Sequence, residues 1–207
     1  MHLPVRGGLH LPVEIGAVYT VGHNYGDPRT RPERPLVYAK ASTSLTAHGS
    51  VVTWDRGLTD NVDCECELGV VMGADNGVFG YTIVNDITSR DEWLDGDQWL
   101  LGKSMPGFCP AGPEIVLTEA LDVADLALGC RINGDPIQDG RTSSMRYSVA
   151  ELIEYLGRHV RLEAGDLIAT GTPPRLTTPP GPSRRLQPGD VITCWIEGIG
   201  ELTNTIG

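Results

Sequence analysis

The sequence has no block of basic residues, no long apolar run and no cysteine pair of the C-x-x-C type. Lys and Arg number 16 and Asp and Glu number 27, so the formal net charge is −11. Nucleic-acid binding depends on clustered cations that neutralise phosphates, and this charge pattern therefore argues against a nucleic-acid partner. No segment approaches the roughly 18 consecutive apolar residues of a membrane-spanning helix, and the first segment, MHLPVRGGLHLPVEIG, lacks the apolar stretch of a signal peptide. We expect a cytoplasmic protein without a membrane partner.

The five cysteines have no spacing that suggests a disulfide framework or a zinc ribbon. They are Cys64, Cys66, Cys109, Cys130 and Cys194. Because an odd number cannot all pair within the chain, free thiols in a reducing compartment fit the sequence best.

Turn-forming residues are abundant, with 26 Gly and 15 Pro among 207 residues. Period-two alternation of apolar residues recurs along the chain, whereas helical periodicity is convincing in one segment only, and this favours a mostly β (α+β) fold. With 40% hydrophobic residues, the chain is long enough for one core, and it has no internal repeat or linker that would divide it. We therefore predict one domain over residues 1–207.

A β-hairpin is predicted where Asn133-Gly134 follows an alternating apolar segment, because this pair tolerates the positive φ angles of a tight turn. The segment VITCWIE, from Val191, is predicted to be a strand whose even-numbered residues share one face. Between the two, Thr177–Arg185 is rich in Pro and is predicted to be an exposed loop.

The one clear helix is predicted to begin after Ser148. In the sequence SVAE, Glu151 stands three residues after the Ser148 hydroxyl, which is the pattern of a capping box. Leu152 and Leu156 share one face, and Gly157 stands where a C-terminal cap is expected. The apolar face predicts packing against a sheet.

The most informative segment, VDCECELGVVM from Val62 to Met72, has an apolar residue at every even-numbered position. The odd-numbered positions begin with Asp63, Glu65 and Glu67. In a strand, alternate side chains share a face at a spacing of about 6.6 Å, so the three carboxylates would form a row above one buried surface. Cys64 and Cys66 would lie on the opposite face as small hydrophobic side chains.

Such a row of like charges raises the pKa of its members or needs a compensating cation. Hard divalent ions such as Mg²⁺ prefer oxygen ligands, and two carboxylates two residues apart can share one ion. An alternative is a solvated acidic edge, since charges on an exposed strand also prevent aggregation. The spacing alone leaves both interpretations open.

Three later segments contain further polar residues beside apolar runs. GYTIVNDITSRD places Asp86 near the end of a predicted strand, where it is either a third metal ligand or part of a turn. QWLLGKS places Lys103 after an apolar stretch, where it reaches solvent or stabilises an anionic intermediate. LIATGTPP places Thr170 and Thr172 in a loop that can offer hydroxyl and backbone N–H groups to a carboxylate.

Taken together and in order, the segments resemble the fumarylacetoacetate hydrolase family, in particular its catalytic, C-terminal-type domain. The matching segments run from about Val21 onward and are VGHNY, KASTSL, DCECELGVVMG, GYTIVNDITSRD, QWLLGKSMPGFCPAGP, INGDPIQDGRTSSMRYSVAELIEYL, LEAGDLIATGTPP and LQPGDVITCWIEGIGELTN. The resemblance implies a compact mixed β-roll with few short helices, a homodimer, and a Mg²⁺ or Mn²⁺ site.

The resemblance also implies roles for individual residues at matching motif positions. The implied metal ligands are Glu65, Glu67 and Asp86. The implied catalytic residue is Lys103, which also faces the substrate, and the other implied substrate-binding residues are Tyr25 and Thr172.

The chain departs from the family pattern in the segment after Tyr25, which reads GDPRTRPERP. Pro28 occupies the place of a histidine that, with a glutamate on a mobile lid, activates water in hydrolytic members, and the Pro content argues against the short lid helix. Glu33 is either a replacement for the lid acid or a surface residue. His23 is expected near the substrate and His48 in a surface turn, while Asp27 is a further candidate carboxylate for the metal.

The implied chemistry starts from a metal-chelated β-dicarbonyl or α-keto acid whose enolate is stabilised by the metal and by Lys103. We predict a divalent-metal-dependent hydrolase that cleaves C–C bonds of a small acylpyruvate-like acid. Decarboxylation or keto–enol isomerisation at the same site is the alternative, favoured by the absent lid histidine, and a catalytically silent ligand-binding relative is a third hypothesis.

The substrate is expected to be a small carboxylic acid. Four cations in or beside the shortened lid segment are interpreted either as contacts for its carboxylate or as solvated side chains, namely Arg29, Arg31, Arg34 and Lys40.

Overall fold

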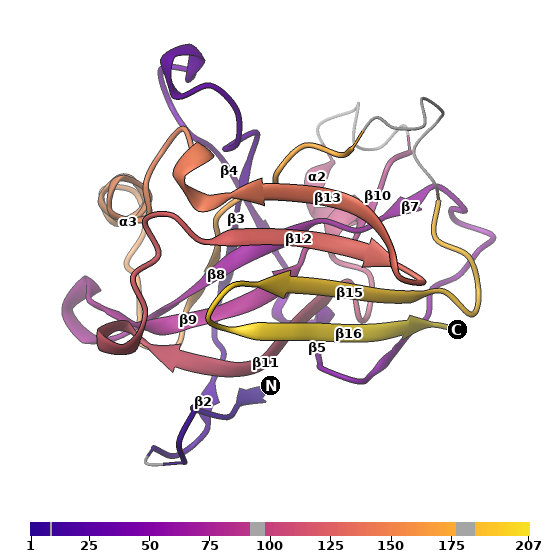
Figure 1. Cartoon of the computed structure of the whole chain (residues 1–207), viewed down its shortest axis with the longest axis horizontal. Helices are drawn as coiled ribbons and strands as arrows, with labels where there is room; N and C mark the ends of the chain where they lie inside the picture. The colour runs from indigo at the N-terminus through magenta and orange to yellow at the C-terminus, as the bar shows by residue number, and fades with distance from the viewer. Residues whose placement is uncertain (9, 92–97, 177–184) are drawn as a thin grey trace.

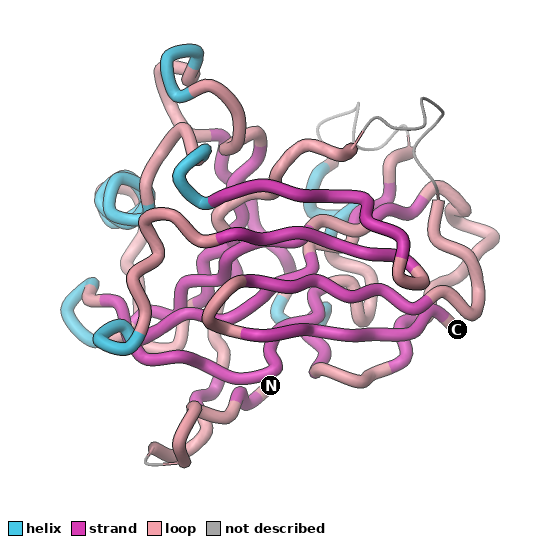
Figure 2. Tube along the Cα trace, viewed as in Figure 1, coloured by secondary structure: helices cyan, strands magenta, loops and turns pink. Residues whose placement is uncertain are grey.

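The computed structural model describes residues 1–8, 10–91, 98–176 and 185–207 and shows a mostly β fold (Figures 1 and 2). The strands are β1 (His2–Leu3), β2 (Val13–Glu14), β3 (Val18–Gly22), β4 (Leu36–Lys40), β5 (Leu45–Ala47), β6 (Val51–Val52), β7 (Val62–Asp63), β8 (Cys66–Met72), β9 (Val78–Asn85), β10 (Thr88–Ser89), β11 (Cys109–Leu117), β12 (Ala127–Ile132), β13 (Asp135–Arg141), β14 (Leu167–Ala169), β15 (Val191–Ile196) and β16 (Gly200–Ile206). The α-helices among the described residues are α2 (Trp99–Lys103) and α3 (Val149–Gly157). Short 3-10 turns are η1 (Pro28–Thr30), η2 (Ser42–Ser44), η3 (Ala74–Asn76), η4 (Thr118–Ala120) and η5 (Thr142–Ser144). The predicted fold class is confirmed.

Two sheets pack face to face around the main core. The first has the strand order β4-β3-β14-β8-β9-β11-β5 and the second the order β13-β12-β15-β16-β6. In Figure 1, β12, β15 and β16 lie in front of β8, β9 and β11. Side chains from both sheets, such as Leu68, Ile83, Leu128 and Ile192, share one buried apolar cluster, so burial of apolar surface holds the sheets together.

The predicted alternation along Val62–Met72 is confirmed, because every even-numbered side chain of this segment is buried in the cluster between the sheets. The strand itself is interrupted, since Cys64 and Glu65 belong to neither β7 nor β8. The reason is a change of partner: β7 pairs with β10, whereas β8 pairs with β9 and β14. At the break, the backbone N–H of Glu65 donates to Asn85 Oδ1 (3.1 Å) and that of Cys66 donates to Gln138 Oε1 (2.9 Å), so side chains replace the strand ladder.

The predicted hairpin is confirmed, because β12 and β13 are antiparallel neighbours joined by Asn133 and Gly134. Their φ angles are 53° and 87°, the left-handed values that a two-residue hairpin turn requires. The predicted strand face of Ile192, Cys194 and Ile196 is buried, as expected. Residues 177–184 of the predicted Pro-rich loop lie outside the described residues, and Arg185 is exposed.

Helix α3 begins at the predicted position. Ser148 accepts a hydrogen bond from the backbone N–H of Glu151, and the Glu151 carboxylate accepts one from the backbone N–H of Ser148, so the capping box is present. The predicted cap at Gly157 is wrong: Gly157 is the last helical residue and Arg158, with φ −78° and ψ −20°, is the C-cap. The N–H groups of Arg158 and His159 bond back into the last turn, and no left-handed residue is needed to end the helix.

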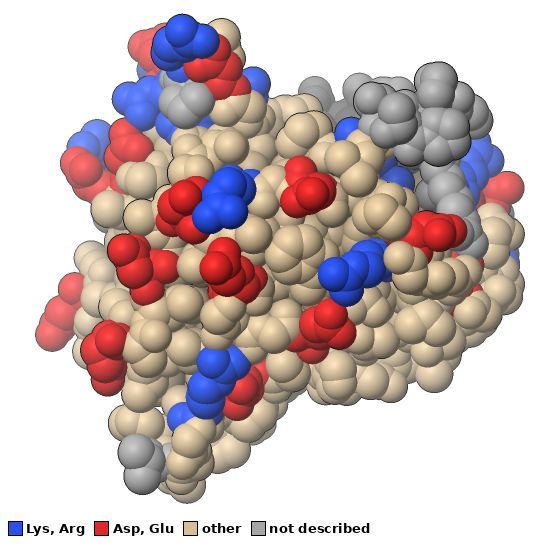
Figure 3. All heavy atoms as spheres, viewed as in Figure 1, with Lys and Arg blue, Asp and Glu red and all other residues tan. Residues whose placement is uncertain are grey.

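All five cysteines are free and buried, which confirms the prediction that they form no disulfide framework. No helix in the described ranges is long and apolar enough to cross a membrane. On the face shown in Figure 3, acidic and basic side chains are interspersed and no extended basic patch is visible.

We predict that Ser148→Ala lowers the free energy of unfolding by about 1 kcal/mol, because the substitution leaves an N-terminal N–H of α3 without its cap. Chemical denaturation of the variant and the wild type measures the difference. The matched control is Ser42→Ala, at an exposed serine of η2, which should change the free energy of unfolding much less. Equal losses in the two variants would contradict the role of the cap.

Candidate active site

A cavity of about 360 Å³ lies where the end of β3, the helix α2 and the loop after β14 meet. Its walls combine aromatic, acidic and basic side chains. Its lining residues are Val21, Gly22, His23, Tyr25, Tyr38, Glu65, Glu67, Arg90, Trp99, Lys103, Gln138, Arg146, Thr172, Pro173, Pro174 and Arg175.

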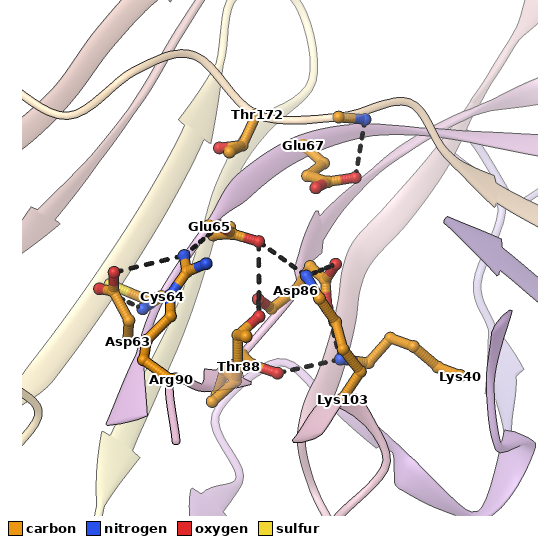
Figure 4. Close-up of polar contacts among 12 residues, drawn as sticks. Lys40, Asp63, Cys64, Glu65, Glu67, Asp86, Thr88, Arg90, Lys103 and Thr172 are labelled. Carbon is orange, nitrogen blue, oxygen red and sulfur yellow. Dashed lines mark hydrogen bonds and ion pairs between the residues drawn. The ribbon is translucent and has the colours of Figure 1, made fainter. Parts of the chain in front are cut away.

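Three carboxylates form a cluster beside this cavity; Glu65 and Glu67 line it, and Asp86 lies buried next to them. Glu65 precedes β8, Glu67 lies in β8, and Asp86 follows the neighbouring antiparallel strand β9 (Figure 4). One oxygen from each residue lies within 4.8 Å of the others. Glu67 is 1% exposed and Asp86 is 0% exposed, which rules out a solvated acidic edge.

Asp63 does not join this group. Its carboxylate accepts a hydrogen bond from Arg175 Nε at 2.9 Å and lies 3.5 Å from Arg90 Nη2. The expected row of three carboxylates along one strand is therefore wrong, because the interruption between β7 and β8 separates Asp63 from the cluster.

Three cations partly balance the cluster of Glu65, Glu67 and Asp86. Lys103 Nζ, at the end of α2, donates to Glu65 Oε2 at 2.8 Å and to Asp86 Oδ2 at 2.6 Å (Figure 4). Lys40 Nζ, at the end of β4, donates to Asp86 Oδ1 at 2.5 Å. Arg90 pairs with Glu65. Glu67 forms no ion pair with any described residue; its Oε2 accepts a hydrogen bond from the backbone N–H of Gly171 at 2.8 Å.

The different contacts of Glu65 and Glu67 shift the pKa values of these two side chains in opposite directions. Burial raises the pKa of Glu65, but the nearby Lys103 and Arg90 outweigh burial and lower this pKa to about 2. Burial raises the pKa of Glu67 well above its usual value, and repulsion by Asp86 adds to the increase. Burial opposes the charge on Lys103, yet Asp86 and Glu65 hold its pKa well above the ordinary lysine value.

The residues present fit a hard divalent cation. All three acidic groups supply oxygen donors, the ligand type that Mg²⁺ and Mn²⁺ prefer. Glu67 is a buried carboxylate without a cationic partner among the described residues, and such a group is costly to keep ionised unless another positive charge lies close by. The arrangement is therefore better suited to a bound metal than to an isolated protein cluster.

The other predicted site residues also reach the cavity. Tyr25 is 6% exposed, and its hydroxyl has no hydrogen-bond partner among the described residues. Thr172 lines the cavity, but its hydroxyl donates to the Cys66 carbonyl (2.8 Å) and accepts from Gln138 Nε2 (2.8 Å). Thr170 is buried and donates to the Leu68 carbonyl instead of facing a ligand.

The segment after Tyr25 has no lid helix; η1 is a single 3-10 turn. Asp27 caps this turn and forms an exposed ion pair with Arg29, so the expectation that it adds a carboxylate to the metal site is wrong. Glu33 is exposed and does not line the cavity, whereas His23 does line it, as expected. His48 lies in a surface turn, as expected.

The segment is bound to α3. Arg31 pairs with Glu151 at 2.7 Å, and its guanidinium lies over the ring of Tyr147. The Tyr147 hydroxyl donates to the Pro32 carbonyl. These contacts hold the segment against the helix surface, and none of Arg29, Arg31 and Arg34 lines the cavity.

Sequence reasoning missed several residues of the site. Lys40 was expected either to contact the substrate carboxylate or to be solvated; both expectations are wrong, because it is buried and paired with Asp86. Arg90, Gln138, Arg146 and Arg175 line the cavity without having been singled out. A sequence signal was available for Arg90, because it follows Asp86 by only four residues.

A family profile described as fumarylacetoacetate (FAA) hydrolase C-terminal matches residues 17–207. The chain belongs to the fumarylacetoacetate hydrolase family. The oxaloacetate tautomerase YisK of Bacillus subtilis (strain 168) is 38% identical to it over 219 residues, which cover 96% of this chain and 73% of that protein.

Solved structures of other family members share the fold. A fumarylacetoacetate hydrolase from psychrophilic Exiguobacterium antarcticum aligns with a TM-score of 0.84 at 38% identity, covering 92% of this chain and 74% of that chain. A 5-carboxymethyl-2-hydroxymuconate delta-isomerase from Mycobacterium smegmatis aligns with a TM-score of 0.82 at 32% identity, covering 94% of this chain and 78% of that chain. Hydrolases, isomerases and a tautomerase therefore carry this family's fold.

We predict that Gly171→Ala disturbs the N–H that holds Glu67. Gly171 has φ +99°, and a Cβ there would lie 2.8 Å from the Asn24 Cβ and 2.9 Å from the Val21 carbonyl oxygen. Backbone strain of about 1–2 kcal/mol and overlap of a further 1–3 kcal/mol, approximately, should lower the free energy of unfolding, measured by chemical denaturation.

The control is Gly189→Ala, where φ is +84° but nothing lies within 4 Å of the added Cβ. This variant carries the backbone strain without the overlap. If Gly189→Ala lowers the free energy of unfolding as much as Gly171→Ala does, backbone strain explains both losses. Close packing around the Gly171 N–H that binds Glu67 then contributes nothing.

Proposed function

We propose that this protein is a divalent-metal-dependent enzyme that catalyses keto–enol isomerisation of a small 2-oxo acid, with oxaloacetate as the first substrate to test. The observation that carries the proposal is the cluster of three carboxylates, two of which line the cavity together with a buried lysine. The segment that would hold a water-activating dyad is bound to α3. Similarity to an oxaloacetate tautomerase and to an isomerase supports the same reaction class.

Glu65, Glu67 and Asp86 are the proposed ligands of Mg²⁺ or Mn²⁺. When bound, the ion supplies Lewis-acid polarisation of the 2-oxo carbonyl, which lowers the energy of the enolate. Lys40 holds Asp86 in place and is a positioning residue, because it is buried and contacts Asp86 but does not line the cavity.

Lys103 is the proposed catalytic residue. Its ammonium group lies between Glu65 and Asp86 and also lines the cavity, so it is placed to stabilise negative charge that develops on the substrate oxygen. The free Tyr25 hydroxyl is the proposed donor to the substrate, and burial keeps its pKa well above the usual tyrosine value, so that it stays protonated.

Proton transfer at the carbon next to the carbonyl requires a general acid or base. His23 is the histidine that lines the cavity, and imidazole is the side chain most often used for this role. We assign proton transfer to His23 as part of this proposal.

Hydrolysis of a C–C bond is the second candidate, favoured by the similarity to the Exiguobacterium antarcticum hydrolase. Hydrolysis and decarboxylation would form an enolate when the C–C bond breaks and would release a second product, whereas isomerisation forms it by loss of a proton and conserves the carbon skeleton. A small carboxylic acid partner and a homodimer remain predictions of the family resemblance.

The first test is metal binding. We predict that the double variant Glu65→Gln, Glu67→Gln loses most of its affinity for Mn²⁺ in calorimetric titrations, because it removes two anionic ligands. The control Glu119→Gln removes one acidic group in η4, outside the cavity, and should bind Mn²⁺ like the wild type. An unchanged affinity of the double variant for Mn²⁺ would contradict the assignment of Glu65 and Glu67 as metal ligands.

The second test is the reaction. We predict that the metal-loaded protein accelerates decay of the oxaloacetate enol in ultraviolet absorbance, and that chelation or Lys103→Met abolishes the acceleration. NMR of the reaction mixture should show only the keto and enol forms of oxaloacetate, because isomerisation leaves the carbon skeleton unchanged.

Cleavage products from an acylpyruvate, with ¹⁸O from labelled water in the released acid, would favour the hydrolase instead. Metal binding without turnover of any 2-oxo acid would favour the catalytically silent relative.

A further inference from the structure

Arg146 is a cation in the cavity wall that forms no ion pair with a described residue, although its charge also acts on Asp27, which is already paired with Arg29. The carboxylate cluster is already contacted by Lys40, Lys103 and Arg90, and Arg175 pairs with Asp63. Arg146 lines the cavity but forms no ion pair within the described ranges, and its Nε is buried without a hydrogen-bond acceptor there. A buried donor of this kind is normally satisfied, so its surroundings lack an acceptor that a ligand can supply.

The position of Arg146 is set by the turn that follows β3. Its backbone N–H donates to the Asn24 carbonyl at 2.6 Å, and its Nη1 donates to the His23 carbonyl at 2.7 Å. Its Nη2 lies 2.7 Å from the point where a Cβ on Gly26 would stand, so the missing side chain of Gly26 leaves room for the guanidinium. The cation is therefore anchored in place before any ligand arrives.

The same anchor ties the backbone of Arg146 to the loop that holds Glu67. The Asn24 side chain donates to the Thr170 carbonyl at 2.8 Å, and the next residue, Gly171, donates to Glu67. Arg90 pairs with Glu65 (Figure 4). Arg90 and Arg146 both line the cavity, so a ligand there meets a second cation besides the one that is paired with the cluster.

We propose that Arg146 binds a second carboxylate of the substrate and selects 2-oxo dicarboxylates over 2-oxo monocarboxylates. The proposal rests on the proposed function for the reaction and extends it to the substrate class. A guanidinium matches a carboxylate with two parallel N–H donors, and Arg146 has N–H groups left after its bond to His23. The charges agree, because a divalent ion at the cluster together with Arg146 leaves an excess of positive charge that a dianion would offset more fully than a monoanion.

The test compares oxaloacetate with 2-oxobutanoate, in which a methyl group replaces the distal carboxylate. We expect Arg146→Met to lower kcat/KM for oxaloacetate by about 10-fold to 100-fold. Deuterium exchange at C3 of 2-oxobutanoate, followed by NMR, should change by less than about threefold. Arg146→Lys should recover part of the oxaloacetate activity, and the control Arg161→Met, at an exposed arginine paired with Glu163, should change neither rate.

Binding of non-reacting analogues separates this proposal from the proposed function. In calorimetric titrations of the Mg²⁺-loaded protein, the wild type should prefer malate to 2-hydroxybutanoate, and Arg146→Met should lose that preference with an unchanged melting temperature. If the wild type shows the preference but turns over neither oxo acid, the proposed reaction fails and the role of Arg146 stands. The role of Arg146 is overturned if the wild type does not prefer malate to 2-hydroxybutanoate. It is also overturned if Arg146→Met loses the same affinity for both ligands.

Discussion

The confinement of three like-charged carboxylates to one buried space is the constraint on which the site depends. Each is costly to bury alone, and their mutual repulsion adds to the cost. The compensating cations come from separate elements: Lys40 ends β4, Lys103 ends α2 and Arg90 follows β10. Only the folded sheet brings these groups together, so the electrostatics of the site and the packing of the first sheet stabilise each other.

Cations are distributed unevenly around the carboxylate cluster, and the proposed chemistry depends on this distribution. Glu65 and Asp86 contact protein cations, whereas Glu67 relies on a backbone N–H from Gly171. Glu67 forms no ion pair with any described residue, and in the proposed function a divalent ion would balance its charge. Because Lys103 contacts the same acids, positive charge from the protein and from the ion would converge on one substrate oxygen, as enolate chemistry requires.

Local patterns predicted local structure well. The Asn133-Gly134 turn and the Ser148 cap depend on φ preference and on a hydroxyl beside an N–H, which neighbouring residues decide. The residues grouped at the cavity were predicted from the order of the family-like motifs along the chain. The spacing of the carboxylates alone did not identify them. Lys40 was misinterpreted because nothing near it in the chain shows that it lies beneath Asp86, 46 residues away. The expected row of three carboxylates is wrong at Asp63 for the same reason, since the arginines that contact Asp63 come from distant segments.

The sequence by itself determined the alternation that buries one face of β8, the family, and the set of residues able to bind a metal. These follow from side-chain type and order along the chain. The tertiary structure alone decided which acids share a site, which cations they meet, and that Arg146 lines the cavity without an ion pair to any described residue. The physical reason is that electrostatic energy depends on distance and burial in space, and neither is encoded by separation along the chain.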